Sequence, residues 1–222
     1  MSNPEAALPE RLKAGTRTLH AASERSGAMA RLLAGTLDRE RYCVLLRALH
    51  AIYTALEAGL DRRAAHPLLQ PVRLVGVARR DALATDLVAL HGLHWRSELP
   101  LAAEAARYAR RVERLARWQP ALLAAHAYVR YLGDLHGGQV LKVLVARRFG
   151  LEGETGTSFY GFGSQGDTRA LIGAFRQGLT EIGHRAPANV ERLVREAQRA
   201  FEAHVRLFVE IDGATAARAA RP

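Results

Sequence analysis

The stretch YLGDLHGGQ, residues 131–139, places three glycines and one carboxylate inside a longer helical pattern. Gly in a helix interior costs up to about 1 kcal/mol relative to Ala, so these positions need a compensating role. An arc of roughly 140° on a helical wheel holds Gly133, Asp134, Gly137 and Gly138. Such an arc exposes bare backbone beside one carboxylate, and freed carbonyls near it can hold ordered water. The pattern predicts either a platform for a flat ligand or a close crossing with another helix.

A second stretch, LKAGTRTLHAASE at residues 12–24, contains groups that could bind a metal centre and its anionic edge. His20 lies seven residues after Lys13, so both point to nearly the same side of a helix, about 10 Å apart along its axis. This spacing is near the span from the centre of a porphyrin to its carboxylate edge. Glu24 follows His20 by one turn and can act on the second imidazole nitrogen, as carboxylates do for metal-bound histidine. A single histidine on a helix is also typical of an ordinary surface or core residue.

Helices must position both stretches, and the whole chain has a helical pattern. Apolar residues recur at spacings of three and four, Ala, Leu, Arg and Glu dominate, and alternating β-branched runs are missing. The sequence therefore predicts an all-α fold. The predicted helical segments are residues 9–26, 38–63, 80–92, 99–117, 119–149, 168–183 and 187–210.

Capping and turn residues set the expected boundaries of these helices. Thr36 or Asp38 is a start signal for the second helix, and prolines at 100, 120 and 187 stand where later helices can begin. The Gly-rich residues 150–167 lack a helical period and predict a long loop. We expect one domain over residues 1–211, followed by a disordered tail at 212–222.

Composition restricts the partners of the protein. No apolar run approaches the roughly 18 residues of a membrane span, and the first residues lack a signal-peptide pattern, so we expect a cytoplasmic protein with no membrane partner. The formal net charge of +10 comes almost entirely from scattered arginines, without the basic and aromatic blocks of a nucleic-acid groove. We therefore expect no nucleic-acid partner; an acidic redox protein fits the charge. The single cysteine, Cys43, lies in a helical stretch and is expected to be a packed thiol.

Residues 131–142, YLGDLHGGQVLK, closely resemble the distal-helix signature of the haem oxygenases, and residues 12–24 resemble the proximal-helix segment of that family. The resemblance continues through ALHAIYTALEAGLD, LLAAHAYVRYLGDL and AFEAHVRLFVEI, so it covers most of the chain in order. It implies a single-domain helical fold that holds haem between a proximal helix and a kinked distal helix.

The resemblance also implies roles for individual residues. His20 corresponds to the proximal ligand of the haem iron, with Glu24 as its hydrogen-bonding neighbour. The distal glycines correspond to Gly133, Gly137 and Gly138, and the carboxylate that organises distal water corresponds to Asp134. The groups that contact the haem propionates correspond to Lys13, Tyr128 and Arg176. The remaining distal hydrogen-bonding residues correspond to Tyr53 and Arg130, and the aromatics around the pocket to Phe201 and Phe208.

At two positions, the residue type or its place on the helical wheel does not match the role that the resemblance implies. The family usually has serine where this chain has His136, and a straight wheel places His136 roughly 130° from the centre of the glycine arc. We therefore expect a packing or outer role for His136 and no second iron ligand. The same wheel places Tyr128 well away from the arc, so its propionate role requires the helix to bend at the glycines.

The implied reaction uses haem b as both cofactor and substrate and O2 as co-substrate. The family cleaves haem at a meso carbon, here expected to be the α carbon, to biliverdin, CO and ferrous iron. Its electrons come from an external donor such as ferredoxin, flavodoxin or a reductase, and we expect a monomer. The alternatives are a non-catalytic haem carrier or sensor, and an unrelated helical bundle that binds no haem. The carboxylate of Asp134 favours turnover over carriage.

Overall fold

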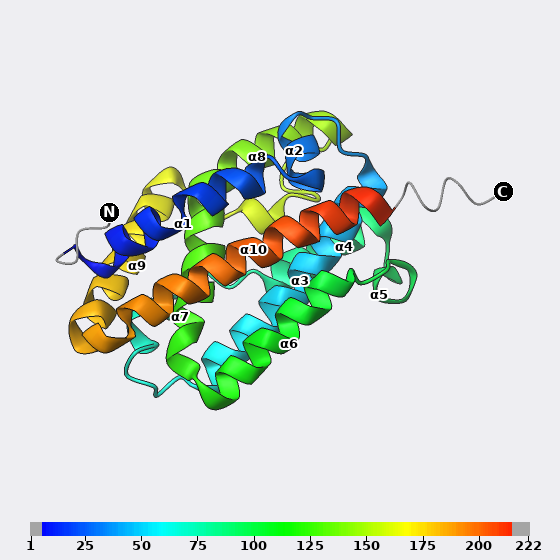
Figure 1. Ribbon diagram of the computed structural model, residues 1–222. Coiled ribbons are helices and arrows are strands. Elements are labelled where there is room, and N and C mark those ends of the chain that lie inside the picture. Colours follow the sequence, from blue (N-terminus) through cyan, green and yellow to red (C-terminus); the bar gives the residue numbers. More distant parts are fainter. Residues whose placement is uncertain (1–5, 215–222) are drawn as a thin grey trace.

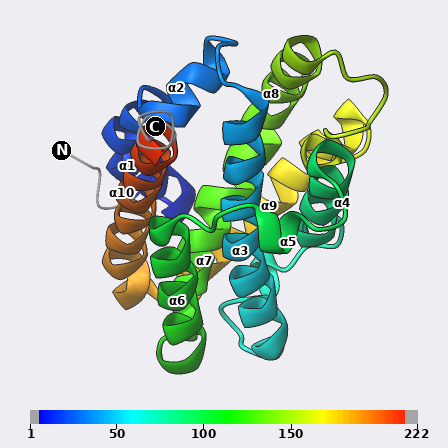
Figure 2. The same cartoon turned by 90° about the vertical axis from the view of Figure 1, so that its right-hand side faces the viewer.

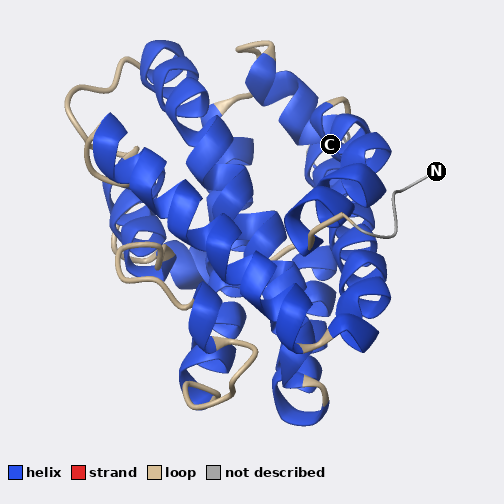
Figure 3. Ribbon diagram, turned by 90° about the vertical axis from the view of Figure 1, so that its left-hand side faces the viewer, coloured by secondary structure: helices blue, strands red, loops and turns tan. Residues whose placement is uncertain are grey.

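The computed structural model of the protein describes residues 6–214, and every regular element in that span is a helix (Figure 3), which confirms the all-α prediction. The α-helices are α1 (Leu8–Glu24), α2 (Gly27–Leu33), α3 (Arg39–Arg62), α4 (Arg80–His91), α5 (Trp95–Glu98), α6 (Ala103–Trp118), α7 (Leu123–Ala127), α8 (Gly133–Phe149), α9 (Gln165–Arg185) and α10 (Val190–Ala214). Short helical turns connect them: η1 (Gln70–Val72), η2 (Pro120–Leu122), η3 (Tyr128–Leu132), η4 (Ser158–Tyr160) and η5 (Pro187–Asn189).

Local capping accounts for several of the helix boundaries. Asp38 is the N-cap of α3, where its carboxylate accepts a hydrogen bond of 2.8 Å from the Arg41 backbone N–H. Ser164 and Asp167 form a reciprocal capping box, so α9 begins three residues before the predicted position. Helix α10 extends to Ala214, past the expected domain end at residue 211. The rest of the predicted tail lies outside the described residues.

The short helix α2 is absent from the predicted set because its seven residues are too few to show a period. Its start requires glycine at residue 27. Gly27 has φ of 39°, and a Cβ at this position would lie 2.1 Å from the carbonyl oxygen of Phe208. A glycine therefore allows α2 to pack directly on the backbone of α10.

Helix α3 forms the centre of the core and packs on α6 and α4 (Figure 2). It is the one helix in residues 6–214 that is long and apolar enough to cross a membrane by length and composition, and 72% of that apolar window is buried inside the protein. Cys43 lies on this helix, where burial raises the pKa of its thiol to about 11. The thiol is packed, as predicted, and stays protonated at neutral pH.

Two groups of helices stand on either side of α3. Helix α1 packs along α10, and α8 packs on η3, η4 and α2 (Figures 1 and 2). Helix α2 contacts α1, α10 and α8, so it connects the two groups at one end. The two stretches that the sequence singles out thus lie on different groups of helices.

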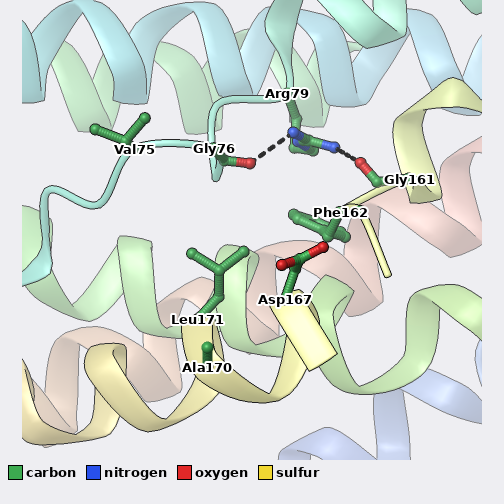
Figure 4. Close-up of a pocket in the computed structure, with 9 residues that line it drawn as sticks. Val75, Gly76, Arg79, Gly161, Phe162, Asp167, Ala170 and Leu171 are labelled. Atoms are coloured by element: carbon green, nitrogen blue, oxygen red, sulfur yellow. Dashed lines mark hydrogen bonds between the residues drawn. The ribbon is translucent and has the colours of Figure 1, made fainter. Parts of the chain in front are cut away.

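Arg79 fixes the loop before α4 to the loop after η4. Its guanidinium donates to the carbonyl oxygens of Gly76 (2.8 Å), Ala78 (2.6 Å) and Gly161, and it stacks over the ring of Phe162, 4.1 Å from the centroid (Figure 4). A surface cavity of about 470 Å³ lies beside it. Because its partners are backbone carbonyls of both loops, Arg79 acts here as a structural clamp.

Candidate functional site

The predicted helix at 119–149 is interrupted before its glycines. Residues 123–127 are α-helical, Tyr128–Leu132 form the π-helical turn η3, and α8 begins at Gly133. A π turn inserts one extra residue into the helical ladder, and such turns are frequent at functional sites. The irregularity therefore lies one turn earlier than the bend expected at the glycines themselves.

The three glycines of α8 have two different environments. A Cβ added at Gly133 or Gly137 would meet no atom within 4 Å, whereas one at Gly138 would lie 3.6 Å from the side chain of Tyr160. Gly133 and Gly137 thus leave backbone bare toward open space, and Gly138 serves packing in the core. No described helix crosses α8 closely at Gly133 or Gly137, so helix packing does not explain these two residues.

The open face of α8 continues from these glycines with apolar side chains. Val140 and Val143 are 60% and 66% exposed, although both are apolar. His136 is also exposed on this face, and its Nδ1–H donates to the Leu132 carbonyl at 2.7 Å. The helical wheel predicts an accessible face of α8 that includes Asp134 and Gly138. In the structure these two residues turn into the core, so the accessible face is centred nearer to His136. An apolar face with bare backbone suits a flat apolar ligand.

Asp134 lies behind this face in a buried network with Arg130 and Tyr53. Arg130 Nη2 donates to both carboxylate oxygens of Asp134, at 2.8 and 2.9 Å, and the Tyr53 hydroxyl donates to Oδ2. Burial raises the pKa of Asp134, against the opposing effects of Arg130 and Tyr53. The sequence predicts these three residues as one distal set, and the structure brings them into direct contact.

Two features of this network were not expected from the sequence. His204 on α10 contacts Arg130, with 3.0 Å between His204 Nε2 and Arg130 Nη1, and its Nδ1–H donates to the Ala200 carbonyl at 2.8 Å. Burial and the Arg130 charge lower the pKa of His204 to about 3, so it is a neutral acceptor. Arg130 Nε is buried and has no partner among the described residues, which leaves one donor for ordered water. No sequence signal separates His204 from the other histidines.

His20 on α1 presents an imidazole that is half exposed, at 52% of its side chain. Its Nδ1 lies 3.6 Å from Glu24 Oε1, which is too long for a direct hydrogen bond, and its Nε2 has no partner within residues 6–214. The ring of Phe201 packs edge-on against it, with 5.5 Å between centroids. Phe208, the other predicted aromatic, is buried and packs on His204 at 5.8 Å. His20 Nε2 is therefore free to bind a metal, and the ring of Phe201 packs beside the imidazole.

The three groups predicted to contact propionates lie along the first half of α1, between Glu10 and Thr16. The Tyr128 hydroxyl is 3.4 Å from the Thr16 hydroxyl on α1, so the π turn brings this tyrosine to the proximal helix. Burial raises the pKa of Tyr128, while Thr16 and the charge of Arg176 lower it. Arg176 donates to Glu10 at 2.8 Å, and Lys13 is exposed.

The protein's donor atoms suit a metal ion that is already bound by most of its ligands in a prosthetic group. No group of three or more His, Cys, Asp or Glu side chains that could hold a bare metal ion occurs in the described part of the chain. A porphyrin supplies four nitrogens to its iron and needs only one axial nitrogen from the protein. His20 Nε2 can supply that nitrogen, and the backbone of α8 at Gly133 and Gly137 is open to the close approach of a flat group.

Comparisons with known proteins agree with this geometry. A family model described as Heme oxygenase matches residues 6–210. The chain is 32% identical to Heme oxygenase 1 of Nostoc sp. and 34% identical to Heme oxygenase 1 of Synechocystis sp., covering 93% of this chain in each case and 86% and 85% of the relatives. It resembles the crystal structure of Synechocystis sp. heme oxygenase-1 in complex with heme with a TM-score of 0.87, 32% identity and 96% coverage of both chains. The structure of the Leptospira interrogans heme oxygenase gives a TM-score of 0.86 at 30% identity, covering 92% of this chain and 100% of that chain.

Proposed function

The chain belongs to the haem oxygenase family, and on that premise we propose which of its residues carry out the reaction and how. It is an enzyme that uses haem b as prosthetic group and substrate and O2 as co-substrate. Bound haem supplies an iron that activates O2 and a ring that is itself oxidised, and the products are biliverdin, CO and ferrous iron. We propose that cleavage occurs at the α meso carbon.

His20 is the proposed axial ligand of the iron. The supporting observation is its free Nε2, exposed on α1 while Phe201 holds the ring from one side. Glu24 lies 3.6 Å from Nδ1 and is placed to orient the imidazole through a modest side-chain movement or one water. Phe201 and Phe208 line this side of α10 and would contribute apolar contact to the macrocycle.

Gly133 and Gly137 have the proposed role of admitting haem and O2 close to the backbone of α8. The open space at both Cβ positions supports this role, whereas the proposed contribution of Gly138 is to pack the helix against Tyr160. Bare backbone places no acid or base of its own beside the iron. Proton supply must then come from a neighbouring group through water.

Asp134 is the proposed source of that proton. Arg130 and Tyr53 fix the orientation of its carboxylate, and burial raises its pKa, so the group can hold a proton at a carboxylate oxygen and pass it to ordered water. The unpartnered Nε of Arg130 offers such a water a hydrogen bond. We propose that Arg130 and Tyr53 keep Asp134 in place during turnover.

The orientation of haem is assigned to basic and phenolic groups on α1, η3 and α9. Lys13, Tyr128 and Arg176 are proposed to hold the propionates, and the ion pair between Arg176 and Glu10 is exposed enough to open for them. Fixing the propionate edge fixes which meso carbon faces the distal water. This is the basis for the proposed α selectivity.

The electron donor is proposed to be an acidic protein such as ferredoxin, flavodoxin or a reductase. The formal net charge of +10 supports this choice, and six arginines line a cleft of about 490 Å³ between α6 and α10, with only two glutamates among the lining residues. We further propose a monomeric, cytoplasmic enzyme. The burial of α3, the one apolar helix of sufficient length among residues 6–214, supports a soluble protein.

The decisive experiment titrates the protein with haem and then adds a reductant in air. We expect stoichiometric haem binding and then conversion of haem to biliverdin. Both are measured by absorption spectroscopy. A haem spectrum that persists under these conditions would mean a carrier, and absence of binding would mean a bundle without a haem site.

The His20→Ala variant tests the axial ligand. We expect loss of most oxygenase activity and an altered ferric haem spectrum, because no other described histidine presents a free nitrogen beside Phe201. Added imidazole should restore part of the activity by filling the vacated position. His94→Ala is the control, since His94 is an exposed histidine at the start of α5. A wild-type spectrum and rate for His20→Ala would show that another histidine binds the iron.

A further inference from the structure

A cluster of buried nitrogen atoms without hydrogen-bond partners in the described part of the chain lies on α3 and α5. Trp95 is fully buried, and its indole N–H has no hydrogen-bond partner within residues 6–214. His50 is 8% exposed, its ring stands edge-on to the indole with 4.9 Å between centroids, and its Nδ1 is also buried without a partner. Buried polar atoms are almost always satisfied by protein, water or an ion, so this cluster needs an occupant.

Two arginines complete the cluster. The guanidinium carbons of Arg47 and Arg96 lie 5.1 and 4.2 Å from the centroid of the Trp95 ring. Arg47 Nε is a third buried nitrogen without a partner, and neither arginine forms an ion pair with a described carboxylate. Burial lowers the pKa of Arg47, and the nearby charge of Arg96 lowers it as well. Two like charges around one indole are stabilised by a shared anion.

The surrounding charges do not supply that anion. Burial, together with the charges of Arg96, Arg47 and Arg80, lowers the pKa of His50 to about 4, with Asp81 as the opposing carboxylate. Asp81 is already paired with Arg80, with 2.9 Å between Oδ1 and Nε. Glu98, on the same helix as Trp95, is paired with His91 at 3.0 Å. A water molecule could satisfy one N–H, but it would supply no negative charge to the two guanidinium groups, of which Arg47 is half-buried and Arg96 is exposed.

We propose that Trp95, His50, Arg47 and Arg96 form a binding site for a small oxyanion, a phosphate or carboxylate group. Guanidinium groups match the paired oxygens of these anions, and the indole and imidazole each contribute one further N–H. The anion would bridge α3 and α5 on residues that take no part in the haem site. The site is thus independent of the proposed catalytic function.

Trp95 itself provides the assay, because the chain contains only one other tryptophan, Trp118, which is 70% exposed. In a Trp118→Phe background, the haem-free full-length chain is titrated with sodium phosphate, sodium acetate or sodium chloride at constant ionic strength. We expect a saturable change in Trp95 fluorescence with phosphate or acetate. The anion that binds with the lower midpoint concentration shows whether the site prefers a phosphate or a carboxylate group. Arg47→Gln and Arg96→Gln should each weaken the midpoint at least about tenfold, a loss of about 1.4 kcal/mol.

Arg62→Gln is the matched control, because Arg62 is an exposed arginine on the same helix and forms no ion pair with residues 6–214. Its titration should equal that of the background protein. Thermal unfolding with and without phosphate supplies a second measurement, since phosphate should raise the Tm of the background and control proteins and leave the Arg47→Gln Tm unchanged. The proposal is overturned if no saturable change occurs up to about 10 mM anion, if chloride acts equally well, or if the two arginine variants respond like the control.

Discussion

Asp134 and Glu196 are both buried carboxylates bonded to arginine, yet their acidities move in opposite directions. Asp134 has one arginine and one phenol as partners, and burial raises its pKa. Glu196 is also buried, but Arg111 Nε donates to it at 2.6 Å and His126 Nε2 lies 3.0 Å from its Oε1. These bonds outweigh burial and lower the pKa of Glu196 to about 2.

The difference between the two sites lies in how completely each charge is compensated. Glu196 is approached by His126, Arg111 and Arg199, so its ionised form is held firmly between α6, α7 and α10. Asp134 shares Arg130 with His204 and lies beside bare glycine backbone. A carboxylate with incomplete compensation can exchange a proton, whereas a fully compensated one fixes structure.

The largest expected effect comes from removing the exchangeable proton of Asp134. Asp134→Asn keeps the shape of the side chain but cannot donate a carboxylic proton, so we expect biliverdin formation to fall at least ~10²-fold while haem still binds. The measurement is single-turnover biliverdin production beside a haem titration. Glu196→Gln, compared at a temperature where both variants are folded, should retain activity within a few-fold. Equal losses in the two variants would remove the functional distinction between these carboxylates.

Stability should show the reverse order. Glu196→Gln removes a charge that several cations stabilise, and we expect a loss of about 2–3 kcal/mol in the free energy of unfolding. Asp134→Asn should cost less, because the fold already disfavours the ionised form of Asp134. Urea unfolding of the haem-free variants measures both values. A larger loss for Asp134→Asn would show that Asp134 is the more firmly held charge.

The pH dependence of stability separates the two groups by sign. Glu196 has a folded pKa of about 2 against an ordinary 4.5, so its contribution is complete above pH 4.5 and is lost as pH falls toward 2. Asp134 has a folded pKa above its ordinary 3.8, so its contribution is complete below pH 3.8 and is lost as pH rises through the folded pKa. Glu196→Gln should therefore flatten the loss of stability on acidification, and Asp134→Asn should steepen it. Unfolding curves from pH 2 to 7 test both signs.

The smallest expected effect concerns His204, which contacts Arg130 from the side away from Asp134. His204→Gln retains a neutral acceptor for Arg130, so we expect a change of about 1 kcal/mol or less in stability and turnover within a few-fold of wild type. His204→Leu removes the acceptor and should reduce turnover further, because Arg130 is then less firmly oriented. Identical turnover in both variants would show that Arg130 needs only Asp134 and Tyr53.

The sequence predicts the helices that carry a long apolar period, and the family resemblance places Tyr53, Arg130 and Asp134 among the distal residues. In the structure, Arg130 and Asp134 lie one helical turn apart and form an ion pair at 2.8 Å. The sequence could not predict that Gly133 and Gly137 face open space while Gly138 packs on Tyr160, because a straight wheel carries no information on which side is covered. The position of the covering loop, with η4, decides this.

His204 and the π turn were beyond sequence reasoning for a different reason. His204 reaches Arg130 through a tertiary contact 74 residues away in the chain, and nothing in its local sequence separates it from an ordinary core histidine. The π turn η3 depends on a hydrogen-bond shift of one residue inside a continuous helical pattern. Both features arise from packing among α7, η3 and α10, which local patterns do not encode.

The extra residue in η3 limits which insertions and deletions the chain can accept. Deleting one residue between 128 and 132 would restore a regular α-helix and rotate α7 by about 100° relative to α8. His126, on α7, could then no longer face Glu196 while Asp134, on α8, faces Tyr53. The partners of both buried carboxylates therefore depend on the rotation of α7 relative to α8. A change of length in η3 would break one set of contacts or the other, although η3 contains neither carboxylate.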